Sequence, residues 1–89
     1  MSNSKVVVIS RSAVERATSP EMRSTYLQLR AFKLLADRLP GFVFPEKVES
    51  LTNKVYYFDC AGETEIAMGV AYAAVVLFEE ALLAHLQRG

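Results

Sequence analysis

Two side chains in this 89-residue chain have the chemistry of a nucleophile and a base: the single cysteine, Cys60, and the single histidine, His85. A thiol near the first turn of a helix ionises more readily, and an adjacent imidazole could accept its proton. A long helical segment separates the two, so they could meet only across a subunit boundary. We therefore expect Cys60 to be a small buried side chain at the end of a strand. His85 is expected near a helix C-terminus, where the helix dipole favours it. An enzyme with a site at a subunit boundary stays open as the second alternative function.

The sequence lacks the residue spacing that a metal site or a phosphate-binding loop requires. One histidine, one cysteine and scattered carboxylates form no known pattern of metal ligands. The four glycines are too far apart to make a phosphate-binding loop. We therefore predict no metal, no cofactor and no assigned catalytic residue.

Basic side chains on the segment 19–39 are the best candidates for binding an anion. They are Arg23, Arg30, Lys33 and Arg38. Arginine suits bidentate contacts with phosphate, so a nucleotide- or nucleic-acid-binding module is the first alternative function. The net charge of zero argues against it, because nucleic-acid binding uses an excess of Lys and Arg. An ordinary solvated helix face is the simpler interpretation of these cations. Leu27 and Leu34 lie among them, one heptad apart, where a protein partner could cover them.

The element that must position everything else is the apolar segment 63–89, which is long enough for a single helix. One stripe of it is expected to form the core, with Ile66, Val70, Ala73, Ala74, Leu77, Ala81 and Ala84 at its centre and Ala71, Phe78 and Leu82 extending it. A second stripe has the alternating three- and four-residue spacing of a helix pair, and it consists of Gly69, Tyr72, Val76, Glu79, Leu83 and Leu86. A monomer of this size can cover one face of the helix but not both, which favours self-association.

A transmembrane role for this helix is not expected. The stretch 66–78 has 13 residues before the Glu79–Glu80 pair, whereas a span needs about 20 apolar residues. The apolar run near the N-terminus is too short for a signal peptide. We therefore expect a cytoplasmic protein without membrane contact.

The other segments predict a small sheet beside two main helices. Residues 1–4 are a polar, flexible lead, and Lys5–Ser10 is rich in β-branched residues, as is typical of a strand. A helix is predicted from Ser19 to Leu39, since Ser19 suits the N-cap, Pro20 the first turn, and Pro40-Gly41 the end.

The second half of the sheet is predicted between this helix and the apolar one. Phe42–Glu49 reads as a short or irregular strand interrupted at Pro45, and Lys54–Cys60 as a strand rich in aromatic residues. Tyr56, Tyr57 and Phe58 could stack on a planar ligand, but core packing from this strand is the simpler interpretation. The predicted fold is a single α+β domain over residues 1–89, with two to three strands and the order β-α-β-β-α.

The expected function follows from the apolar residues that the core does not need. Hydrophobic residues make up 52% of the chain, more than one small core requires. We expect a small non-enzymatic binding or regulatory protein, of the adaptor or inhibitor type found in bacteria and their viruses, acting as a homo-oligomer. A different protein as partner stays open. The residues assigned to association are Leu27, Leu34, Gly69, Tyr72, Val76 and Leu83.

Overall fold

The computed structural model describes residues 10–88, and these form four helices. They are α1 (Arg11–Glu15), α2 (Pro20–Asp37), α3 (Glu46–Cys60) and α4 (Thr64–Arg88). Within this range there is no strand, so the predicted α+β fold with a sheet is wrong. The strand predicted over Lys5–Ser10 and the lead over 1–4 lie outside the described residues, except for Ser10, which is the N-cap of α1.

The beginning and end of α2 confirm the helix predicted for this segment to within two residues. The Ser19 side chain accepts a hydrogen bond from the Met22 backbone N–H at 3.1 Å, and Pro20 occupies the first turn. This cap satisfies a backbone donor that the first turn leaves without a helical partner. Beyond the C-terminus, Gly41 has a φ of 76°, a left-handed conformation that favours glycine and turns the chain away.

Helix α3 covers the second half of the predicted strand Phe42–Glu49 and the whole of the predicted strand Lys54–Cys60, and neither strand is present. Its buried residues are Val48, Thr52, Val55 and Asp59, at the three- and four-residue spacing of one helix face. The two strands predicted here left residues 50–53 between them, which divides this helical pattern, and their β-branched and aromatic residues favoured strands. Strand propensity depends strongly on context, and burial of one face against α4 determines the outcome here. Pro45 does not break a strand but lies at the N-cap position of α3.

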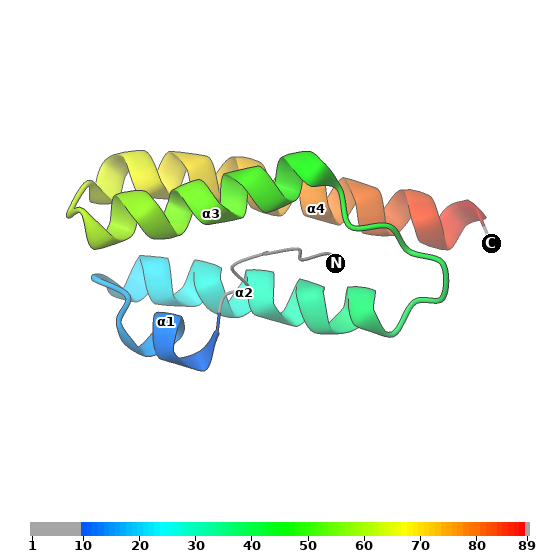
Figure 1. The fold of residues 1–89 in the computed structure, drawn as a ribbon, viewed down its shortest axis with the longest axis horizontal. Coiled ribbons are helices and arrows are strands. Elements are labelled where there is room, and N and C mark those ends of the chain that lie inside the picture. Colours follow the sequence, from blue (N-terminus) through cyan, green and yellow to red (C-terminus); the bar gives the residue numbers. More distant parts are fainter. Residues whose placement is uncertain (1–9, 89) are drawn as a thin grey trace, which may run out of the picture.

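Helices α3 and α4 form an antiparallel hairpin, and α2 runs along it while α1 lies against α2 (Figure 1). The turn between α3 and α4 contains Gly62, whose φ of 84° again favours glycine. The helix predicted within 63–89 is confirmed as α4 over Thr64–Arg88, and Gly89 lies outside the described residues. Because α4 packs against both α3 and α2, it is the central element of the fold.

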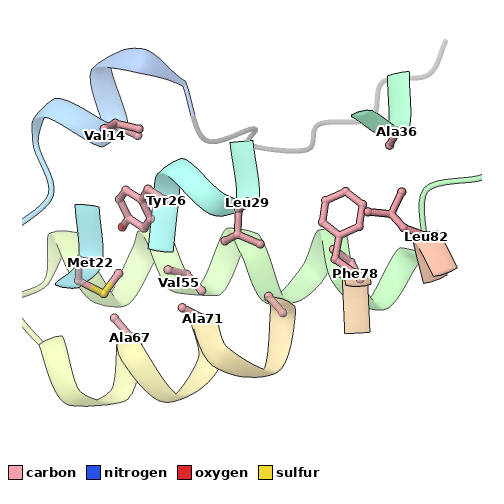
Figure 2. Packing of buried hydrophobic residues seen from close by; sticks show 13 residues of the cluster. Val14, Met22, Tyr26, Leu29, Ala36, Val55, Ala67, Ala71, Phe78 and Leu82 are labelled. Carbon is pink, nitrogen blue, oxygen red and sulfur yellow. The ribbon is translucent and has the colours of Figure 1, made fainter. Parts of the chain in front are cut away.

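The core lies between α4 and the other two long helices (Figure 2). On α4 the buried residues are Ala67, Ala71, Ala74, Phe78 and Leu82. The observed core stripe is therefore rotated from the predicted one. Ala71, Phe78 and Leu82, predicted at the edge of the stripe, lie at its centre. Ile66, Ala73 and Ala84, predicted at its centre, are exposed. The reason is the ring of Phe78, which packs edge-to-face with Phe32 and Phe44 at centroid distances of 5.4 and 5.0 Å. Small residues at 67, 71 and 74 let the neighbouring helices approach closely.

Candidate interaction surface

The outward face of α4 carries large apolar side chains that the chain itself leaves in water. Tyr72 is 72% exposed, Leu83 50% and Leu86 53%. Only 28% of the most apolar 18-residue window of α4 is buried. We use the name α4 seam for the stripe Gly69, Tyr72, Val76, Glu79, Leu83 and Leu86. All of its members are exposed except Val76, which is half-buried.

The α4 seam faces away from the core. At 100° per residue, its members centre about 130° away from the buried stripe. A monomer therefore cannot bury both stripes with the same neighbours. The predicted role of the α4 seam in association stays a prediction, but its exposure is the condition that such a role requires.

Packing within the chain does not require a glycine at position 69 of the α4 seam. A Cβ added at this position would meet nothing within 4 Å, so no neighbour within the chain excludes a side chain. Glycine inside a helix costs about 1 kcal/mol relative to alanine, because it loses more backbone freedom. A partner helix approaching closely at this point would use the missing side chain.

Helix α4 also has the length and apolar composition to cross a membrane, judged on those two properties alone. Core helices of soluble proteins pass the same test. In this fold α4 is partly buried against α2 and α3, and the Glu79 and Glu80 side chains lie exposed on it. Vesicle binding is therefore a necessary companion measurement to self-association.

The outer face of α2 holds a second group of exposed leucines. Leu27 is 51% exposed, Leu34 56% and Leu35 42%. Each of these leucines lies away from the buried residues of α2, which are Met22, Tyr26, Leu29 and Ala36. The α2 leucines and the α4 seam are thus on the outward faces of two different helices.

The four predicted anion-binding cations have different surroundings. Arg23 donates from Nε to the Val14 carbonyl at 3.4 Å, which ties α2 to α1. Lys33 forms an ion pair with Asp37 at 3.0 Å, one helical turn away. Arg30 is half-buried, and Arg38 is exposed at the C-cap of α2. Contacts within the chain thus occupy Arg23 and Lys33, which an anion site would have to displace.

A polar cluster around the buried Asp59 carboxylate joins four segments at the end of the molecule near the α3–α4 turn. The Asp59 carboxylate accepts a hydrogen bond from the Tyr26 hydroxyl at 2.7 Å and another from the Thr18 hydroxyl at 2.7 Å. The Thr18 and Thr64 hydroxyl oxygens are 3.4 Å apart. Burial, followed by the hydrogen bond to Asp59 and its charge, raises the pKa of Tyr26 above its ordinary value.

Neither Tyr26 nor Thr18 was predicted as a site residue from the sequence, and Asp59 was predicted near the end of a strand. The available signal was Asp59 itself, since an aspartate one helical turn beyond Val55 on the buried face of α3 requires hydrogen-bond donors. Every member of the cluster has a partner within it, and the described buried side chains leave no polar atom unsatisfied. The cluster therefore acts as a structural link between the helices.

Cys60 and His85 lie at opposite ends of the hairpin. Cys60 is the exposed last residue of α3, so the predicted buried position at a strand end is wrong. His85 lies in the last turns of α4 and donates from Nε2 to the Pro40 carbonyl at 3.1 Å, while its ring meets Phe42 edge-to-face. At 1.5 Å per residue, α4 alone separates the two by about 30 Å, so they do not form a pair within one chain.

The aromatic run at the end of α3 follows the helix rather than the alternation of a strand. Tyr57 is exposed, whereas Tyr56 and Phe58 are half-buried. In the part of the chain that the structure describes, no group of three or more His, Cys, Asp or Glu residues is placed to hold a metal ion. The exposed apolar face of α4 is thus the surface of the described chain that most clearly suggests a function.

Comparison with protein-family models, with curated proteins and with solved structures finds no match for this chain.

Proposed function

We propose that this protein is a small cytoplasmic binding protein without enzymatic activity, which acts as a homo-oligomer of the adaptor or inhibitor type. The observation that carries the proposal is the α4 seam. It places Tyr72, Leu83 and Leu86 in water on the most apolar helix of the chain, at the spacing by which helices pair. Contiguous exposed apolar surface of this kind is typical of protein–protein contacts.

The polar residues of the described chain support a binding role over a chemical one. The buried Asp59 carboxylate has hydrogen-bond donors within the chain, and His85 holds the loop after α2 against α4. Arg23 and Lys33 have partners within the chain, which lends less support to an anion site on α2. No observation favours a second candidate function.

The proposal is tested by the mass in solution, measured by light scattering over a range of protein concentrations. The wild-type chain is expected to form a dimer or a larger assembly, and Leu83→Glu is expected to weaken it by placing a charge on the contact. Ile66→Glu is the matched control, because Ile66 is 47% exposed on the same helix but lies outside the α4 seam. A monomer at every concentration would overturn the proposal.

A second arm distinguishes a membrane from a protein partner. The wild-type chain is mixed with vesicles of phosphatidylcholine and phosphatidylglycerol, and co-flotation is measured. We expect the protein to stay in the soluble fraction. Flotation that Leu83→Glu abolishes and Ile66→Glu preserves would assign the α4 seam to a lipid surface and overturn the proposal.

A further inference from the structure

We infer that the partner covering the α4 seam is a second copy of this chain, with its α4 helix antiparallel to the first. This inference rests on the proposed function and specifies how the copies meet. A two-fold axis between positions 76 and 79 would place Gly69 against Leu86 of the partner subunit and Tyr72 against Leu83 of the partner subunit. Val76 would lie against Glu79 of the partner subunit.

The size of the side chains favours this direction. Antiparallel pairing places the smallest residue of the α4 seam, Gly69, opposite the large side chain of Leu86. A parallel pair would instead place two glycines in one layer and two leucines in another, leaving a void at one end. Close-packed interfaces avoid such voids, because the lining atoms lose their contacts.

The charges favour the same direction. Glu79 is the one acidic member of the α4 seam, and a parallel pair would place its two copies face to face in a single layer. Like charges in that position are destabilising. In the antiparallel pair each Glu79 meets Val76, and the long side chain can extend its carboxylate to the edge of the contact.

The two ends of α4 also carry opposite charge. Glu65 lies in the first turn, whereas Arg88 lies in the last. Antiparallel helices bring the acidic end of one copy beside the basic end of the other and oppose the two helix dipoles. A parallel pair would gather the like-charged ends together.

The open surroundings of Gly69 agree with a close approach at this point. Nothing within the chain lies within 4 Å of a Cβ built there, so a helix from outside has access to the backbone. On the second copy, Leu86 at the matching position and Leu83 one turn before it both have exposed side chains. The contact therefore needs no rearrangement of the fold.

Disulfide trapping tests the direction of pairing. In a Cys60→Ser background, Gly69→Cys and Leu86→Cys proteins are mixed, oxidised in air and resolved by mass spectrometry. The antiparallel pair predicts a mixed 69–86 disulfide as the main product. It predicts little self-linking of either protein, since two copies of position 69 would be about 25 Å apart along the helices.

An Ala84→Cys protein is the control, because Ala84 is exposed on α4 but lies outside the α4 seam. It should link to neither of the other two proteins. Dominant 69–69 and 86–86 products from a chain that light scattering shows to be a dimer would overturn the antiparallel arrangement while leaving the proposed function standing. A dimer that gives none of these links would place its interface elsewhere and also overturn the inference. A monomer would overturn both.

Discussion

Tyr26 of α2 donates its hydroxyl hydrogen to the carboxylate of Asp59 at the end of α3 across 2.7 Å, and both side chains are buried. The two residues are 33 positions apart in the chain. Because α2 and α3 share few other contacts and meet mainly through α4, this bond ties together two helices that would otherwise be joined indirectly. Thr18 donates to the other oxygen of the same carboxylate.

Removing the Tyr26 hydroxyl should weaken the fold without opening a large cavity. Tyr26→Phe leaves the ring in place but deletes a hydrogen bond to a buried charged group, so the free energy of unfolding should fall by about 1.5–3 kcal/mol. Urea unfolding followed by circular dichroism measures this change. Tyr57→Phe is the matched control, since Tyr57 is exposed and should change stability by only a few tenths of a kcal/mol. Equal effects of the two substitutions would contradict a stabilising role for the Tyr26–Asp59 hydrogen bond.

The raised pKa of Tyr26 predicts a loss of stability in alkaline solution. In the unfolded chain Tyr26 releases its proton near pH 10, whereas in the folded chain it keeps the proton to higher pH. Folding therefore binds a proton above pH 10, and the free energy of unfolding should fall by about 1.4 kcal/mol per pH unit there. Below pH 10 the contribution is fully present. Denaturant unfolding between pH 8 and 11 tests this slope, and Tyr26→Phe should remove this component.

Phe78 should contribute more to stability than its neighbour Leu77. Phe78 is buried among Phe32 and Phe44, whereas Leu77 is half-buried at the edge of the core. Phe78→Ala is expected to cost about 3–5 kcal/mol through lost burial and the cavity that remains. Leu77→Ala should cost clearly less, and thermal or urea unfolding of both variants compares them. The reverse order would mean that the buried face of α4 is the one first expected from the sequence.

Gly69→Ala should have opposite effects on the single chain and on the assembly. Because an added Cβ meets nothing within the chain, the monomer should gain about 0.8–1 kcal/mol from higher helix propensity. The added methyl group should hinder close approach of a second α4, so self-association should weaken. Urea unfolding at low protein concentration measures the first effect, and light scattering measures the second. Ala73→Gly, at an exposed site of α4 outside the α4 seam, should destabilise the monomer and leave the assembly unchanged.

Helices α2 and α4 were predictable because their signals are local. The bounds of α2 follow from Ser19 and Pro20 at one end and Pro40-Gly41 at the other, and each acts through backbone groups a few residues away. Helix α4 follows from an apolar run too long for a strand. The second apolar stripe of α4 was visible for the same reason, since helical spacing alone places Tyr72 and Leu83 on one face.

Helix α3 was not predictable from local preference, which favours strands over 54–60. The buried residues Val48, Thr52, Val55 and Asp59 have the spacing of one helix face. Burying that face stabilises the helix only when α4 packs against it, and this contact is not visible in the local sequence. The core face of α4 was misplaced for a related reason: two apolar stripes compete, and the packing of Phe78 among aromatic rings selects between them.

The sequence by itself determined the two longest helices, the capping of α2, and the surplus of apolar surface on α4, because these depend on neighbours within a few turns. Only the tertiary structure decided that the chain is helical at α3, that Tyr26 and Thr18 meet Asp59, and that Cys60 and His85 lie at opposite ends. Each of these depends on contacts between residues far apart in the chain, whose free energy exists only when the helices have packed together.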